Sequence, residues 1–156
     1  MSKPLSEGAR APAFTLSTDG EGKIASKDLK GQKIVLYFYP KDDTSGCTKQ
    51  AIGFTEAKQK FKRAGAVIVG VSKDSVAKHD KFKEKHDLKI TLGSDEAGKV
   101  LEKYGVWVEK SMYGRKYMGI ERSTFLIDEK GVIQKIWRKV RVAGHVDEVL
   151  AVAKSI

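Results

Sequence analysis

The chain has 156 residues, of which 30 are lysine or arginine and 20 are aspartate or glutamate, so its formal net charge is +10. Hydrophobic residues make up 40% and charged residues 32%, a composition too apolar for a disordered chain and too interrupted by charge for a membrane protein. The longest strongly apolar run, residues 34–39, is far shorter than the roughly 20 residues of a transmembrane helix. We expect one domain spanning residues 1–156.

Short apolar runs separated by glycine, proline and serine predict a series of strands. The expected strands are residues 11–16, 33–39, 65–72, 123–128 and 132–140. A helix is expected over roughly 45–63, because apolar side chains recur there near a 3.5-residue spacing. Further helices are expected near residues 75–86, 96–103 and 144–154.

The order of these elements predicts how they pack. Residues 33–39 and 66–71 are apolar on both sides of the alternation, as expected for central strands covered on both faces. A strand, helix and strand in sequence form a right-handed crossover, so these two strands should be parallel. Residues 123–128 and 132–137 are typical of a hairpin with a short glycine-containing turn. The sequence therefore predicts an α/β protein with a central mixed sheet flanked by helices.

Cys47 is the single cysteine, which excludes an internal disulfide, a Cys-x-x-Cys redox pair and a cysteine-rich zinc site. It follows the C-terminal end of a predicted central strand and enters the next helix in its first turn, the edge at which α/β sheets place their active sites. Free backbone amides and the helix dipole favour a thiolate there. Cys47 is therefore a candidate nucleophile, although a lone cysteine is more often a small buried side chain.

The segment PKDDTSGCT resembles the active-site loop of the peroxiredoxins, whose pattern is Pro-x-x-x-Thr/Ser-x-x-Cys; Pro40, Thr44 and Cys47 occupy its fixed positions. Within that family, FYPKDDTSGCTKQA is similar to the bacterioferritin-comigratory or Q-type (Bcp/PrxQ) branch. The stretch GIERSTFLID resembles the segment that supplies the branch's active-site arginine, which implies that role for Arg122. The resemblance extends along nearly the whole chain.

This resemblance implies a thioredoxin-like fold with an N-terminal β-hairpin extension. It also implies thiol-dependent reduction of hydrogen peroxide and organic hydroperoxides through a sulfenic acid on Cys47, without a metal or cofactor. The partner would be an external thiol reductant of the thioredoxin or glutaredoxin/glutathione type. With no signal peptide evident near the N-terminus, we expect a cytoplasmic monomer that does not contact membranes.

Each implied site residue has a chemical role and an alternative. A thiolate attacks one peroxide oxygen while the other leaves with negative charge, and the guanidinium of Arg122 can stabilise both charges; the alternative is a surface or ion-paired arginine. The Thr44 hydroxyl can bond the peroxide and the sulfur, cap the helix, or do both. Pro40 would shape the pocket and exclude water, or simply form a turn.

Two positions depart from the branch. Many members carry a second, resolving cysteine five residues after the first, where this chain has Ile52, and others carry it in the helix near 80–84, where this chain has none. Ile52 lies about 140° around the helix from Cys47, so we expect it to lie off the apolar stripe. Position 50, often glutamate, is Gln50, which leaves the charge near the thiolate open. The chain therefore resembles a one-cysteine version.

Other classes of function fit less well. Cys47 could act as a redox sensor whose oxidation alters a protein contact, which peroxide turnover would distinguish. The +10 charge and the basic stretch 135–141 allow binding of nucleic acid, but the other basic clusters are typical of solvated helix faces, so we expect no nucleic-acid partner. Residues 93–100 nearly match a phosphate-binding loop but lack its Ser/Thr, and the three histidines lack metal-ligand spacing. A cysteine hydrolase would need a histidine beside Cys47.

Overall fold

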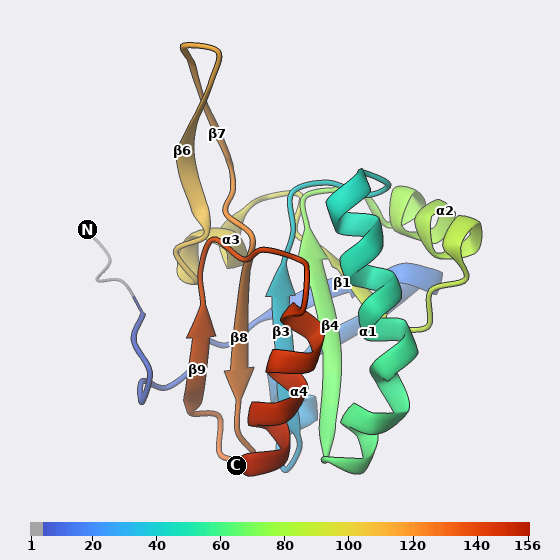
Figure 1. Cartoon of the computed structure of the whole chain (residues 1–156), viewed down its shortest axis with the longest axis vertical. Coiled ribbons are helices and arrows are strands. Elements are labelled where there is room, and N and C mark those ends of the chain that lie inside the picture. The colour runs from blue at the N-terminus through green and yellow to red at the C-terminus, as the bar shows by residue number, and fades with distance from the viewer. Residues whose placement is uncertain (1–4) are drawn as a thin grey trace.

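The computed structural model describes residues 5–156, and most of its strands belong to one mixed sheet (Figure 1). The strands of this sheet are β1 (Thr15–Thr18), β2 (Gly22–Ala25), β3 (Lys33–Phe38), β4 (Ala66–Ser72), β5 (Thr91–Ser94), β8 (Ser123–Ile127) and β9 (Ile133–Trp137). They lie in the order β2-β1-β5-β4-β3-β8-β9. The pairs β3–β4 and β4–β5 are parallel and the other pairs are antiparallel.

The predicted centre of the sheet is confirmed. β3 and β4 are parallel, and every residue of β3 is buried, as a strand covered on both faces requires. The hairpin of β8 and β9 is also confirmed, with an irregularity of register between Leu126 and Ile127. The expected N-terminal hairpin is formed by β1 and β2.

Helices cover the two faces of the sheet unequally. α1 (Ser45–Arg63), α2 (Val76–His86) and α4 (His145–Ser155) supply side chains to the core on one face, and α1 and α4 lie side by side over the sheet (Figure 1). α3 (Lys99–Lys103) supplies the core on the other face together with the chain around β1. Each core is a continuous cluster of buried apolar side chains.

Several predicted boundaries were wrong. The first strand was predicted over 11–16 but begins at Thr15, because Pro12 has no N–H to donate to a ladder. α3 was predicted from residue 96 but begins at Lys99, because Gly98 adopts a left-handed conformation with φ +78° and caps it. The last strand ends at Trp137 rather than 140.

The residue pattern did not predict β5 or a second hairpin formed by β6 (Trp107–Met112) and β7 (Arg115–Ile120), and β2 was expected only through the N-terminal hairpin that the family resemblance implies. The hairpin of β6 and β7 pairs only with itself and projects from the body of the protein (Figure 1). Its two-residue turn has positive φ at both Tyr113 and Gly114, the geometry that suits the twist of a hairpin. Among the described residues, no helix is long and apolar enough to cross a membrane.

Candidate active site

Cys47 is the third residue of α1, directly after the loop that leaves β3. Thr44 precedes the helix in an extended conformation, and its carbonyl accepts the backbone N–H of Thr48 at 2.8 Å, which fixes the first turn. The Cys47 side chain is 2% exposed and packs in the core cluster that contains Tyr37 and Phe54. The thiol is therefore placed at the free amides of a helix start while being shielded from bulk water.

The guanidinium of Arg122 connects the thiol to a second residue of α1. Its Nη2 donates to Cys47 Sγ at 3.3 Å, and its Nη1 donates to Gln50 Oε1 at 2.6 Å. The backbone of Arg122 is held in place as well, because its carbonyl accepts the N–H of Val140 at 2.9 Å. Arg122 thus reaches the sulfur from the position directly before β8, the strand next to β3.

Gly46 allows this close approach. A Cβ atom at position 46 would lie 3.1 Å from Arg122 Nη2, closer than an ordinary van der Waals contact. Because glycine carries no side chain, the guanidinium can lie directly against the first turn of α1. The glycine directly before Cys47 therefore has a steric reason.

The sequence left open how position 50 affects the charge near the thiol, and the surroundings of Gln50 answer this. It is fully buried one turn after Cys47 on the same face of α1, and it binds Arg122 through its carbonyl oxygen. Since an amide is neutral, the positive charge of Arg122 is not cancelled there and remains directed at the sulfur. Its Nε2 is buried and has no hydrogen-bond partner among residues 5–156.

Thr44 and Pro40 lie at the outer side of this centre. Both are exposed, and the Thr44 hydroxyl donates to the carbonyl of Lys41 at 2.9 Å rather than to sulfur. It accepts no hydrogen bond from the amides at the helix start. Pro40 lines a cavity of about 660 Å³ between the loop and the projecting hairpin, together with Trp107 and Lys110. Burial, and after it the charge of Arg122, lower the pKa of Lys110.

Tyr37 is a polar residue near the thiol that the sequence analysis treated only as part of an apolar strand. It stacks on Phe54 with ring centroids 4.7 Å apart, and its ring fills the space over Gly70 on the neighbouring strand. Burial, followed by the charges of Cys47 and Asp42, raises the pKa of Tyr37 well above its usual value. Its buried hydroxyl is without a partner among the described residues and stays protonated.

The three histidines bind other groups. His145, at the start of α4, pairs its Nε2 with the Thr124 hydroxyl at 2.8 Å, and burial lowers its pKa to about 4, so it is neutral at pH 7. His79 and His86 bind aspartates of the loop before α1. Within the described part of the chain no histidine bonds Cys47, and no group of three or more His, Cys, Asp or Glu side chains is arranged to hold a metal ion.

A mixed sheet with a shielded cysteine at the start of the helix after a central strand, and an arginine on its sulfur, defines a thiol-based oxidoreductase of thioredoxin-like fold. Comparison with known proteins narrows this class. The chain matches the AhpC/TSA family over residues 8–136. It therefore belongs to that family of peroxiredoxins, in the Bcp/PrxQ branch, and is a thiol-dependent peroxidase.

Relatives in this branch match nearly end to end. The chain is 55% identical over 143 residues to a putative peroxiredoxin bcp of Coxiella burnetii, covering 92% of this chain and 95% of that protein. It is 49% identical over 149 residues to peroxiredoxin Bcp of Bacillus subtilis, covering 96% and 95%. A structure of the bacterioferritin comigratory protein of Xanthomonas campestris, studied for its alkyl peroxide reduction activity, superposes with a TM-score of 0.87 at 43% identity, covering 91% and 90%. The predicted family and fold are confirmed.

Proposed function

We propose that Cys47 is the peroxidatic residue and reduces both hydrogen peroxide and organic hydroperoxides. The thiolate attacks one peroxide oxygen, the O–O bond breaks, and the second oxygen leaves as water or alcohol after taking up a proton, which leaves Cys47 as a sulfenic acid. The observation that carries the proposal is the 3.3 Å contact between Arg122 Nη2 and the sulfur of the single, shielded cysteine. The alkyl peroxide activity of the Xanthomonas campestris relative supports the organic substrates.

Arg122 has the central electrostatic role in this proposal. Negative charge lies on sulfur before the reaction and on the leaving oxygen during it, and a fork of donors can stay bonded to one while it stabilises the other. Gln50 orients the fork without neutralising it. Lysine could supply the charge but not two fixed donors at once.

Thr44 and Pro40 would act on the peroxide rather than on the sulfur. Since the Thr44 hydroxyl already donates to Lys41, its oxygen is free to accept the peroxide O–H, whereas donating to sulfur would require the hydroxyl to rotate. Pro40, as a wall of the cavity beside the loop, would limit how water and substrate approach.

Recycling requires a thiol from outside the chain, because Cys47 is its only cysteine. The incoming thiol attacks the sulfenic sulfur and releases water to form a mixed disulfide, and a second thiol then frees Cys47. Thioredoxin, or glutaredoxin with glutathione, would supply these two thiols. The monomeric state, the single domain and the cytoplasmic location stay predictions, of which light scattering after gel filtration tests the first.

Intact-mass spectrometry tests the proposed cycle. With excess peroxide and no thiol, Cys47 should gain one oxygen and then two or more as the sulfenic acid proceeds to sulfinic acid. Glutathione added early should instead give a mixed disulfide, and multiple turnovers should appear with one of the two reductant systems. Cys47→Ser should abolish all of these products. A reducible dimer joined through Cys47 as the main product would refute the one-cysteine mechanism.

A further inference from the structure

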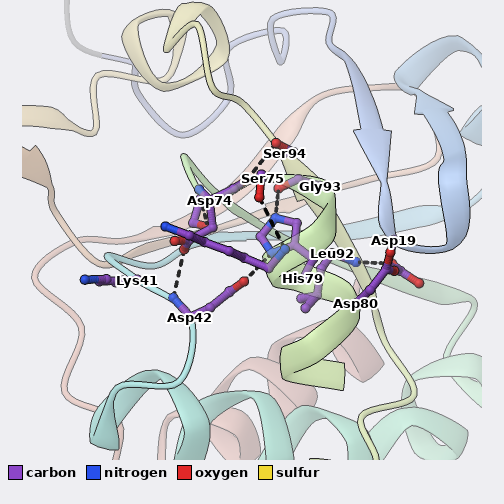
Figure 2. A network of polar contacts seen from close by, with 12 residues as sticks. Asp19, Lys41, Asp42, Asp74, Ser75, His79, Asp80, Leu92, Gly93 and Ser94 are labelled. Atoms are coloured by element: carbon purple, nitrogen blue, oxygen red, sulfur yellow. Dashed lines mark hydrogen bonds and ion pairs between the residues drawn. The ribbon is translucent and has the colours of Figure 1, made fainter. Parts of the chain in front are cut away.

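A buried polar network attaches the loop before the active-site helix to α2. His79 of α2 is fully buried, its Nδ1 lies 2.6 Å from Asp42 Oδ2, and its Nε2 lies 2.9 Å from the carbonyl oxygen of Gly93 at the end of β5 (Figure 2). Asp42 lies between Pro40 and Thr44, five positions before Cys47. One imidazole thus joins the loop, a helix and a strand.

The two partners of His79 determine its protonation. A backbone carbonyl can only accept a hydrogen bond, and so can an ionised carboxylate, so both ring nitrogens need a proton. Burial acts to lower the pKa of His79, but the hydrogen bond and charge of Asp42, with smaller contributions from Gly93 and Asp74, outweigh it and raise the pKa above its usual value. The imidazolium is therefore the form that satisfies every partner.

Further hydrogen bonds hold Asp42 and the loop in place around this pair. The Tyr39 hydroxyl donates to Asp42 Oδ1 at 2.5 Å, and lies 3.5 Å from His79 Nδ1. The backbone N–H of Asp42 donates to Asp74 Oδ2 at 2.8 Å, and that oxygen also accepts the Ser72 hydroxyl at 2.7 Å. These contacts bring the residue after β3, the end of β4 and the loop after β4 into the same network.

Two further carboxylates near this network, Asp19 of the 3-10 turn (Asp19–Glu21) and Asp80 of α2, are engaged elsewhere. Asp19 accepts the N–H of Leu92 at 2.9 Å and the ammonium of Lys83 at 2.7 Å. Asp80, next to His79, accepts the N–H of Gly20 at 2.7 Å. Asp42 is thus the carboxylate that binds the His79 ring, with Asp74 behind it.

We propose that protonated His79 is a positioning residue, which holds the Pro40–Thr44 loop in the conformation in which Cys47 reacts with peroxide and releases it when the proton is lost. Without that proton, the lone pair of Nε2 faces the Gly93 carbonyl, or Nδ1 loses its donor to Asp42. Either loss leaves a buried polar group unpaired, which the loop can relieve by moving away from α2. The role of the loop in the reaction rests on the proposed function of Cys47.

Nuclear magnetic resonance of the imidazole group tests the protonation directly and needs no activity. His79 should be doubly protonated at pH 7 and should titrate above the ordinary value of about 6.5 for histidine. A neutral His79 at pH 7 would overturn the proposal. Because this measurement uses only the folded protein, it stands even if Cys47 were found not to reduce peroxide.

Rate constants for the reaction of Cys47 with hydrogen peroxide test the link to chemistry. At each pH the wild-type rate is divided by that of His79→Gln, so that the ionisation of Cys47 cancels. The ratio should be about ten or more at low pH, as expected for loss of one charge-assisted hydrogen bond, and should fall toward one as pH rises through the titration of His79. A ratio that does not change with pH would reduce His79 to a merely structural role and refute the proposal.

His86→Gln is the matched control. His86 lies on the same helix and binds the next loop residue, Asp43, at the surface, where Lys85 also binds Asp43. The ratio of the wild-type rate to that of His86→Gln should therefore stay near one at every pH. If His79→Gln does not fold, Asp42→Asn takes its place, because the amide keeps an acceptor for His79 but removes the charge. The ratio of the wild-type rate to that of Asp42→Asn should then show the same dependence on pH. A wild type that does not react with peroxide refutes the proposed function instead, while the imidazole titration still decides the protonation.

Discussion

Adding one methyl group at Gly46 should slow the peroxidase reaction without unfolding the protein. In Gly46→Ala the new Cβ would lie 3.1 Å from Arg122 Nη2. The guanidinium must therefore retreat by a few tenths of an ångström from the turn that also carries Cys47, and its 3.3 Å bond to the sulfur lengthens. Removing a transition-state donor altogether costs about 2.7 to 4 kcal/mol. We expect a partial loss, about tenfold in the second-order rate constant, or roughly 1.4 kcal/mol.

Stopped-flow measurement with hydrogen peroxide gives this rate, and urea unfolding gives the stability. The free energy of unfolding should stay the same or rise by up to about 1 kcal/mol, because alanine favours helix over glycine. Gly53→Ala is the matched control, since Gly53 lies on the same helix and its Cβ would meet Val146 at 3.0 Å rather than Arg122. That control should alter stability through the Val146 contact and keep the rate. A wild-type rate in Gly46→Ala would show that the position of Arg122 does not limit the reaction.

Three further changes test other contacts. Arg122→Lys should lower the rate of reaction with peroxide by about a hundredfold to a thousandfold, because an ammonium cannot bond the sulfur and Gln50 together. Arg115→Lys, on the exposed hairpin, should keep the wild-type rate. Equal rates in the two variants would mean that the active-site arginine is misassigned. Ile52→Cys should form a disulfide with Cys47 after peroxide treatment, which non-reducing mass spectrometry detects. The Cα atoms of residues 47 and 52 are about 8.7 Å apart in a helix, so the first helical turns must unwind for the bond to form. A persistent sulfenic acid on Cys47 would show that they do not unwind. His145 has a pKa of about 4 in the folded protein and about 6.5 in the unfolded chain, so the unfolded chain takes up a proton first as the pH falls. The free energy of unfolding should therefore fall by up to about 3 kcal/mol between about pH 6.5 and pH 4. Urea unfolding of His145→Asn should show a smaller loss of stability over the same pH range.

The central elements could be predicted because several signals agree there. The apolar run of β3, the polar loop and the periodic helix α1 each point to the same crossover, and α1 spans Ser45–Arg63 as expected. The position of Cys47 follows from that crossover alone. The location of Gln50 beside Cys47 could also have been predicted, because it lies one turn beyond Cys47 on the same face of the helix.

The hairpin of β6 and β7 could not be predicted from periodicity. Most of its residues are exposed on both sides, so the sequence has no apolar alternation, and its turn is formed by Tyr113 and Gly114 rather than by the usual Asn-Gly. β5 has only four residues, too few for a pattern. Pairs such as Asp42 with His79 are 37 positions apart and depend on how α2 packs, which residue spacing does not reveal.

Ile52 is where the sequence analysis misjudged the core, and the correction bears on the catalytic cycle. Ile52 is partly buried against the core cluster rather than free of it, because the side of α1 next to the main stripe still meets neighbouring apolar side chains. The start of α1 is thus held by Ile52 from within and by the His79 network through the loop. A shielded sulfur favours reaction with a small peroxide, but an external thiol must reach the same sulfur, which is 2% exposed.

The two half-reactions therefore place opposite demands on the loop. If His79 holds the loop closed, His79→Gln should react more slowly with peroxide but should let glutathione reduce the sulfenic acid faster, since the thiol must wait for less opening. Rapid mixing of pre-oxidised protein with glutathione, followed by mass spectrometry of the mixed disulfide, measures the second rate. Slowing of both steps would mean that His79 acts on the chemistry of Cys47 by a route other than access. Opposite changes in the two rates would show that one buried ion pair sets the balance between oxidation and recycling.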